Sequence, residues 1–486
     1  MAEEKRGVSR RDALTAMGAW SAAAAMAGDA EAAGQDQGKA GRAVAAKAAA
    51  GTHDEFLREL AALVNSTPMV DTHEHLPEED VRLRGEWVPC DDWGVLFSHY
   101  LNSDLIAAGM PDEELARLLS REVEPAGKWK ILAPYWPAVK NTGFARATRI
   151  AIRELYGIDE LNVQTVRRLQ AGYESLRKPG LYRRVLTEVG GIESCQVDGF
   201  GPYRESRQPQ LMMQDMNVNG LHIGPDVENL AGPTGISVGE LADWHTVIRW
   251  WFDKYGRYAT AIKSPAAYGR GLDYQKVEAE QVEDVFRRVL EEGQVSAEER
   301  KRLGDHLFWY VVEQAVKHNL PVKLHTGYYY GNGYMPLERV AGNPAQAAGL
   351  CRLGPDVQWV FMHIAYPYWH DLLAVAKHYR NAHIDMCWAW IIDPVASTQF
   401  LKSHLVTAPA NKVFVFGGDY IPVECIVGHA RMARKGVTRA LGELVDEDYI
   451  SRSDALGLVE PLLRGNAHEL YNLKVKSERL RGAPWA

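Results

Sequence analysis

Short runs of apolar and β-branched residues recur along the chain from residue 51 onward, and stretches with helical spacing separate most of them. The runs predict eight strands, at 68–71, 191–197, 210–213, 258–263, 320–324, 357–362, 382–386 and 412–416. Helical stretches between them include 237–254, 280–318, 366–380 and 422–441. Eight strands that alternate with helices predict an α/β protein built as a TIM (β/α)8 barrel. An open doubly wound sheet is the alternative, but the sequence has no G-x-G-x-x-G turn to support it.

The stretch between the first two predicted strands, residues 76–190, is far too long for a single crossover connection. Its periodicity predicts a mainly helical insertion, with helices over 104–121, 145–156 and 162–177. We therefore predict one barrel domain over 55–475 that includes this insertion. A C-terminal tail over 476–486 is expected to follow it.

The first 50 residues differ from the rest of the chain. Arg10-Arg11 precedes a weakly apolar, alanine-rich stretch over 13–28, and Ala30-Glu31-Ala32 resembles a cleavage site. This order predicts a twin-arginine signal peptide over 1–32, although Ala13 stands where an aromatic residue is usual. A flexible linker over 33–54 and a periplasmic or secreted location follow from it. The alternative is a disordered basic tail with a chance arginine pair.

The composition of the chain limits the kinds of molecule that we expect it to bind. The 486-residue chain has a formal net charge of -8 and no basic block in its body, which argues against nucleic-acid or anionic-membrane binding. No run of about 18 apolar residues predicts a membrane span. The 14 Trp and 21 Tyr suit a pocket for a small-molecule substrate. Whether the chain forms a homo-oligomer stays open.

The cysteines do not predict a disulfide framework or a zinc ribbon. They are odd in number, far apart and without a C-x-x-C pair, so we interpret them as small buried residues. They are Cys90, Cys195, Cys351, Cys387 and Cys425.

Residues that can bind a metal or move a proton stand at the ends of the predicted strands, where TIM barrels place their active sites. The first strand ends in Asp71-Thr72-His73-Glu74-His75, and residues two apart on a strand point to the same side, so the two imidazoles can converge on one cation. The others stand at the ends of the fourth, fifth, sixth and eighth strands. They are Lys263, His325, His363 and Asp419.

This order of His-x-His, Lys, His, His and Asp resembles the amidohydrolase superfamily, over most of residues 65–472. The resemblance implies that His73 and His75 bind a divalent metal, zinc first and manganese as an alternative, in one or two ions. It implies that a carboxylated Lys263 bridges two ions. It also implies that His325 and His363 bind a second ion or polarise substrate, and that Asp419 binds metal and shuttles protons as a catalytic residue.

Each of these residues has a simpler interpretation. Lys263 could pair with a nearby acid, and His325 or His363 could be a core histidine bonded to backbone. Asp419 could cap the helix that follows, which is compatible with catalysis. We assign no chemical role to the histidines in helical stretches, which include His245, His306, His318 and His378.

A looser resemblance links the insertion to that of uronate isomerases. It rests on the segment from Phe97 to Gly109, on Lys128-Trp129 and on the segment from Arg153 to Asp159. The Gly-Asp-Tyr-Ile-Pro stretch at 418–422 departs from that group, in which we expect a serine- and arginine-containing turn after the aspartate. The departure puts isomerase activity in doubt.

Four residues are candidate substrate contacts: His99, Tyr100, Tyr268 and Arg270. An arginine can pair bidentately with a carboxylate. Packing aromatics and a surface arginine are the simpler interpretation. The aromatic, glycine-rich loop over 328–334 suits a pocket wall or lid, or a well-packed surface loop.

The leading hypothesis is a metal-dependent hydrolase that uses activated water on a small amide, lactone, ester or cyclic imide. The alternatives in the same superfamily are a sugar-acid isomerase and a decarboxylase. A non-enzymatic alternative is an exported barrel that binds metal or carbohydrate.

Overall fold

The computed structural model describes residues 52–199, 201–293, 295–331 and 335–485. The predicted signal peptide over 1–32 and all but the last residues of the predicted linker lie outside the described residues. The chain divides into two units, Met1–Glu55 and Phe56–Ala486, and the strands all lie in the second.

Nine short strands form the wall of a barrel within the described residues, and all their pairings are parallel. They are β1 Met69–Glu74, β2 Ile192–Val197, β3 Met212–Gln214, β4 Met216–Asn217, β5 Ile262–Ser264, β6 Val322–Leu324, β7 Trp359–Met362, β8 Ala382–Asp385 and β9 Val413–Phe414. Each of the eight predicted strands is present with shifted ends.

The third predicted strand, 210–213, corresponds to β3, and a further short strand, β4, follows beyond its predicted end, because the backbone changes partner at Asp215. Asp215 N donates to Val197 O on the β2 side at 3.0 Å, and Met216 N donates to Ala261 O on the β5 side at 2.9 Å. The sheet therefore has two parts, in the orders β1-β2-β3 and β4-β5-β6-β7-β8-β9. Thr72 N donates to Phe416 O at 3.0 Å, which joins β1 to the segment after β9 and closes the circle.

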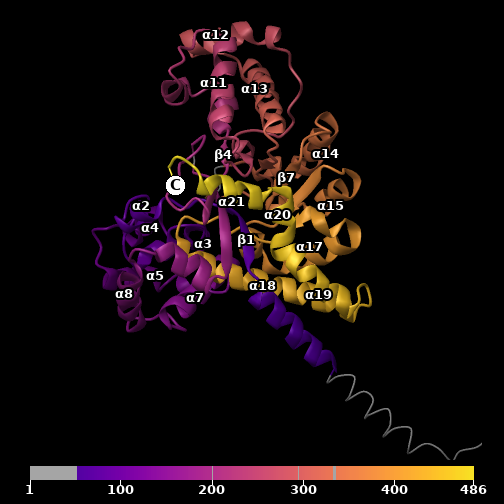
Figure 1. Cartoon of the computed structure of the whole chain (residues 1–486). Helices are drawn as coiled ribbons and strands as arrows, with labels where there is room; N and C mark the ends of the chain where they lie inside the picture. The colour runs from indigo at the N-terminus through magenta and orange to yellow at the C-terminus, as the bar shows by residue number, and fades with distance from the viewer. Residues whose placement is uncertain (1–51, 200, 294, 332–334, 486) are drawn as a thin grey trace, which may run out of the picture. The chain divides into compact units, whose positions relative to one another are not determined.

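Helices separate the strands and fill the insertion (Figure 1). Those between β1 and β2 are α2 Glu79–Leu83, α3 Leu101–Ala107, α4 Asp112–Leu118, α5 Pro125–Leu132, α6 Trp136–Val139, α7 Gly143–Tyr156 and α8 Thr165–Leu176. Those from β4 to β8 are α9 Asn219–His222, α10 Val227–Ala231, α11 Leu241–Tyr255, α12 Glu283–Glu292, α13 Ala297–Lys317, α14 Asn343–Leu353 and α15 Trp369–His378. The remainder are α16 Ala389–Ile392, α17 Pro394–Thr407, α18 Val423–Asp446, α19 Arg452–Glu460, α20 Asn466–Leu470 and α21 Leu473–Arg481.

The insertion packs on the barrel's last long helix through α7. Thr142 caps the start of α7 by accepting a hydrogen bond from Ala145 N, and Gly157 ends it in the left-handed conformation, at φ 64°. Helix α18 approaches α7 closely at Gly428, where an added Cβ would lie 1.8 Å from the Ala147 carbonyl oxygen. A residue without a side chain is therefore required at this crossing.

The C-terminal segment differs from the predicted tail over 476–486. Helix α21 continues to Arg481, and Leu473, Lys476 and Leu480 are buried. These residues follow the i, i+3, i+7 spacing of a buried helix face, and Lys476 Nζ donates to the Gly256 carbonyl oxygen at 3.0 Å. The segment is thus part of the folded unit.

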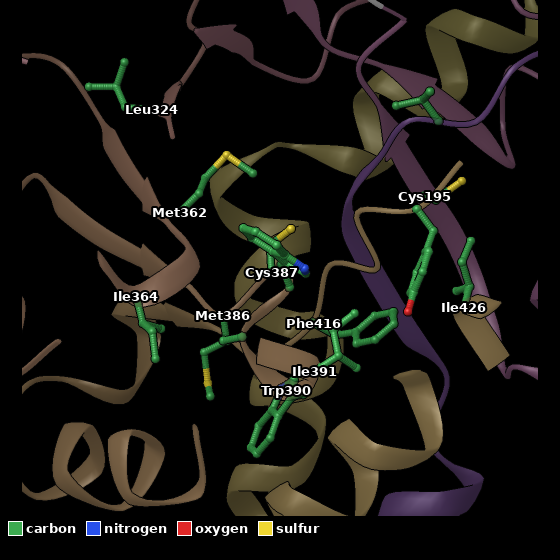
Figure 2. Close-up of a cluster of buried hydrophobic side chains, with 14 of the residues drawn as sticks. Cys195, Leu324, Met362, Ile364, Met386, Cys387, Trp390, Ile391, Phe416 and Ile426 are labelled. Carbon is green, nitrogen blue, oxygen red and sulfur yellow. The ribbon is translucent and has the colours of Figure 1, made fainter. Parts of the chain in front are cut away.

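The barrel interior holds both apolar and charged side chains. Lys323 and Asp215 are fully buried and form an ion pair of 2.7 Å, and the same ammonium donates to the Thr72 carbonyl oxygen at 2.6 Å. Figure 2 shows part of the hydrophobic core, with Leu324 and Met362 drawn among its side chains. All five cysteines are buried and free, as predicted. In the described part of the chain, no helix is long and apolar enough to cross a bilayer.

Candidate metal centre

The predicted site residues reach one face of the barrel because parallel strands end there together. His73 lies in β1 and Lys263 in β5, and the others follow β1, β6, β7 and β9. They surround a cavity of about 330 Å³. The predicted residues that line it are His75, His99, Tyr100, Lys263, Tyr268, His325, His363 and Asp419. His73 is fully buried beside them.

Three donor atoms converge at this face. His73 Nε2 and His75 Nε2 are 3.3 Å apart, and Asp419 Oδ1 lies 3.4 Å from the first and 3.2 Å from the second. Metal–ligand bonds of about 2.0–2.1 Å, arranged tetrahedrally, place neighbouring ligand atoms about 3.3–3.4 Å apart. The donor set therefore fits a divalent cation.

The tautomer of His75 also suits metal binding. His75 Nδ1 lies 3.2 Å from the Asp198 carbonyl oxygen, which can only accept, so Nδ1 carries the proton and Nε2 presents a lone pair. An outer hydrogen bond of this kind fixes the orientation of metal-binding histidines.

The histidines at the ends of β6 and β7 present lone pairs in the same way. His363 Nδ1 donates to the Cys387 carbonyl oxygen at 3.0 Å, and its buried Nε2 has no hydrogen-bond partner among the described residues. His325 Nε2 donates to the Tyr328 carbonyl oxygen at 3.0 Å, which leaves Nδ1 as the acceptor. The ring centroids of His325 and His363 are 4.4 Å apart. Neutral His363 cannot donate from Nε2, so this atom can only accept a proton or bind a cation.

Burial sets the protonation of the site. It lowers the pKa of His363 to about 4, and burial followed by the charge of Lys263 lowers the pKa of His73 well below its usual value. Burial alone would raise the pKa of Asp419, but its contacts with the His75, His73 and His363 imidazoles bring it well below its usual value. Near neutral pH His73 and His363 are neutral and Asp419 is ionised, which are the forms that bind a metal.

Lys263 is 2% exposed and its Nζ lies 3.1 Å from His73 Nε2. Among the described residues, no carboxylate lies within ion-pair distance of it. The interpretation in which Lys263 simply pairs with an acid is therefore wrong.

The loops that carry the site are strained. Asp419, His363 and Tyr100 have φ angles of 61°, 60° and 57°, in the left-handed region that non-glycine residues rarely occupy. The Tyr100 hydroxyl donates to the Asp419 carbonyl oxygen, and the Tyr100 ring stacks on Trp388 with a centroid distance of 4.8 Å. Such strain persists only where the surroundings hold it in place. Tyr100 is one element of that support.

Comparisons with known proteins agree with this geometry. A family model described as Amidohydrolase matches residues 238–473. This segment of the chain is similar to that family. The matched segment includes Lys263, His325, His363 and Asp419, whereas His73 and His75 precede it.

Solved structures with the same fold cover most of the chain. Glucuronate isomerase from Caulobacter crescentus is 16% identical and covers 87% of this chain and 94% of its own, with a TM-score of 0.69. Uronate isomerase from Thermotoga maritima is 13% identical, with coverages of 86% and 97% and a TM-score of 0.68. A protein described as a metal-dependent hydrolase from Lactobacillus casei is 15% identical, with coverages of 86% and 98% and a TM-score of 0.60. The predicted TIM barrel and the looser similarity to uronate isomerases are confirmed.

A curated relative matches a shorter stretch. Protein fluG from Emericella nidulans is 24% identical over 224 residues, which is 44% of this chain. The chain spans a quarter of the length of that relative.

One predicted substrate contact does not lie at the candidate site. Arg270 does not line the cavity. Its guanidinium forms a 2.5 Å ion pair with buried Asp305 and lies 4.0 Å from the Tyr274 ring centroid. The arginine that sequence reasoning placed on substrate is thus part of the packing between the segment after β5 and α13.

The structure also adds residues that sequence reasoning missed. Asp198 follows β2 directly and lines the cavity, so the strand-end rule could have found it. Tyr330 lines the cavity from the loop after β6. Two further acidic residues, Glu74 and Asp71, contact the loop between β9 and α18. Glu74 Oε2 accepts from Tyr420 N at 2.7 Å, and Asp71 Oδ1 accepts from Gly418 N at 3.1 Å. Both carboxylates hold the loop that carries Asp419.

Proposed function

We propose that the protein is a metal-dependent hydrolase that acts on a small, uncharged ester, lactone, amide or cyclic imide. The observation that carries the proposal is the convergence of His73 Nε2, His75 Nε2 and Asp419 Oδ1 at 3.2–3.4 Å beside the cavity. Tightly packed lone pairs of this kind are unfavourable unless a proton or a cation lies between them.

His73, His75 and Asp419 would hold a first divalent ion, and zinc suits a set of two imidazoles and one carboxylate. Such an ion polarises a carbonyl oxygen and lowers the pKa of water. His325 and His363 present lone pairs that suit a second ion. The Lys263 amine is buried beside His73 and has no carboxylate partner among the described residues; its reaction with carbon dioxide, with loss of a proton, would give an anionic carbamate able to help hold metal.

We assign the proton transfer to Asp419. Its Oδ1 faces His73 and His75, while its Oδ2 lies 3.9 Å from His363 Nδ1. The carboxylate borders the cavity, where it can accept a proton from the attacking water and return it to the leaving group.

The cavity lining supports an uncharged substrate. Three phenols and one imidazole that line it can hydrogen-bond a carbonyl or hydroxyl group: Tyr100, Tyr268, Tyr330 and His99. Its described lining contains no arginine, and Lys263 is its one cation. A sugar acid needs a cation for its carboxylate. A carboxylated Lys263 could not supply one.

The second candidate is isomerisation of a sugar acid. The similarity in fold to glucuronate and uronate isomerases over 86–87% of the chain favours it. In this case Lys263 keeps its ammonium and binds the substrate carboxylate. A decarboxylase would release carbon dioxide and incorporate no solvent oxygen into an acid.

The test is turnover in H₂¹⁸O on a panel of lactones, esters, amides and uronates, with zinc- or manganese-loaded protein. A hydrolase incorporates one labelled oxygen into the product acid. An isomerase converts an aldose to a ketose without this label. Saturable metal binding without turnover on the whole panel would instead support a binding protein.

The Asp419→Asn variant examines the proposed base. We expect kcat to fall by about 10²–10⁴-fold, because the amide cannot accept the proton. His378→Gln, on the exposed part of α15, is the matched control and should leave turnover unchanged. Near-normal turnover of Asp419→Asn with metal retained would refute the role of Asp419.

A further inference from the structure

A second pair of facing imidazoles lies on two helices outside the barrel cavity. His245 is on α11 and His306 is on α13, and these helices contact each other where they stand with α12 in Figure 1. The two Nε2 atoms are 3.0 Å apart, compared with 3.3 Å for His73 and His75 in the barrel. Neither His245 nor His306 lines the barrel cavity.

The tautomer of His306 is fixed. Its Nδ1 lies 2.7 Å from the Val277 carbonyl oxygen, so Nδ1 carries the proton and Nε2 presents a lone pair. A histidine that donates one ring nitrogen to a backbone carbonyl and offers the other to a cation is the usual arrangement of a metal ligand. His75 has the same arrangement with the Asp198 carbonyl.

The ring of His245 is held in a matching orientation. It stacks on Tyr310 with a centroid distance of 3.9 Å and an interplanar angle of 12°. Burial, and then the charge of His306, lower the pKa of His245 to about 4, so it is neutral near pH 7. Without a metal, its Nε2–H donates to His306. Transfer of that proton to Nδ1 through solvent leaves two lone pairs that face each other.

The surroundings add negative charge. The pair lines a hollow of about 260 Å³ together with Glu278, Glu280 and Glu313. The one cation in this lining is Lys276, whose Nζ lies 5.1 Å from the Trp309 ring centroid. A cation in the hollow would therefore meet three carboxylates and one ammonium.

We propose that His245 and His306 bind a divalent transition-metal ion, with zinc as the representative, at the contact between α11 and α13. Two imidazoles select ions such as zinc over calcium or magnesium, which prefer oxygen ligands. Among the described residues, no third histidine, cysteine or carboxylate ligand atom lies close enough to join the two imidazoles, so water completes the coordination. The ion links the helix that precedes β5 to the helix that precedes β6, and it does not take part in the reaction. The competing interpretation is a neutral hydrogen bond between the two histidines.

The experiment counts zinc ions per chain by equilibrium dialysis and elemental analysis of the full-length protein. His245→Gln and His306→Gln each remove one imidazole and retain a hydrogen-bonding group, and His378→Gln is the control. We expect each of the first two variants to bind one ion fewer than wild type, with turnover unchanged. The His73→Gln/His75→Gln variant should keep the ion at α11 and α13. Equal stoichiometry in wild type and in both single variants would overturn the proposal.

A spectroscopic measurement covers the case in which a variant does not fold. Copper(II) added to the His73→Gln/His75→Gln protein should give an electron paramagnetic resonance spectrum with coupling to two imidazole nitrogens. A spectrum without that coupling would overturn the proposal and leave the hydrogen-bonded pair. Because His325 and His363 remain in the barrel of this protein, the same measurement is made after His306→Gln is added; the two-nitrogen coupling should then be lost, and its persistence would overturn the proposal.

Discussion

Gly418 precedes the proposed catalytic aspartate, and its substitution by alanine tests how rigidly the site is built. An added Cβ would lie 1.9 Å from Glu74 Oε1 and 3.2 Å from Asp71 Oδ2. Glu74 is fully buried, and its other oxygen accepts a hydrogen bond from Tyr420 N at 2.7 Å. The carboxylate therefore cannot swing into solvent to make room for a methyl group.

The expected loss of stability follows from the short distance between the added Cβ and Glu74 Oε1. Real Cβ contacts are not shorter than 3.0 Å, so Glu74 or the loop must move by about 1 Å. Overpacking of this kind costs about 1–3 kcal/mol of unfolding free energy. If the loop moves, Asp419 moves with it, and a displacement of about 1 Å lowers turnover by about 100-fold.

The assay compares unfolding free energy, metal content and turnover of Gly418→Ala with those of wild type. Gly457→Ala is the control, because its Cβ in α19 would meet no atom within 4 Å. Alanine in a helix interior should leave the control as stable as wild type or about 0.5–1 kcal/mol more stable. Wild-type metal content, stability and turnover in Gly418→Ala would refute the view that Glu74 and the Asp419 loop are rigidly packed.

Three further predictions concern other parts of the fold. Tyr100→Phe removes the hydrogen bond to the Asp419 carbonyl and should cost about 1 kcal/mol of unfolding free energy and lower kcat; unchanged values would show that the hydroxyl supports nothing. Arg270→Met should destabilise the fold by about 1–3 kcal/mol through buried Asp305 and leave KM unchanged, and a raised KM in substrate kinetics would restore Arg270 as a substrate contact. Burial lowers the pKa of His404 from its ordinary 6.5 to about 4, so the unfolded chain binds more protons between these pH values and stability rises with pH there. His404→Gln should make that dependence shallower by up to about 1.4 kcal/mol per pH unit, and urea titrations with equal slopes would contradict this.

The barrel could be predicted because its strands carry a local signal. Runs such as 357–362 are apolar, β-branched and flanked by helical stretches, and β7 forms where this run predicts it. The short strand β4 after Asp215 could not be predicted, because it arises from a change of hydrogen-bond partner between β2 and β5. The helical character of α21 was missed because its buried face includes Lys476, which resembles a surface residue in the sequence.

The candidate metal site could be predicted by the same reasoning, apart from the misplaced Arg270 and the residues that were missed, of which Asp198 is one. His73, His75, His325, His363 and Asp419 come together because each stands at the end of a barrel strand, a position that the sequence reveals. Asp198 obeys the same rule after β2. Arg270 was misplaced because its partner, Asp305, comes 35 residues later on another element.

The insertion explains why the sequence indicates the chemistry more readily than the substrate. The proposed metal ligands belong to strand ends, but the cavity wall over Asp419 comes from the segment that follows β1, through His99 and Tyr100. The same segment reaches the loop after β6, because Asn102 Nδ2 donates to the Tyr330 hydroxyl at 2.9 Å. A barrel can therefore keep its metal site while changes in this segment alter the shape and hydrogen bonding of the cavity. Substrate differences among proteins that share this barrel should follow this segment, and exchanging it should change specificity with the metal content unaltered.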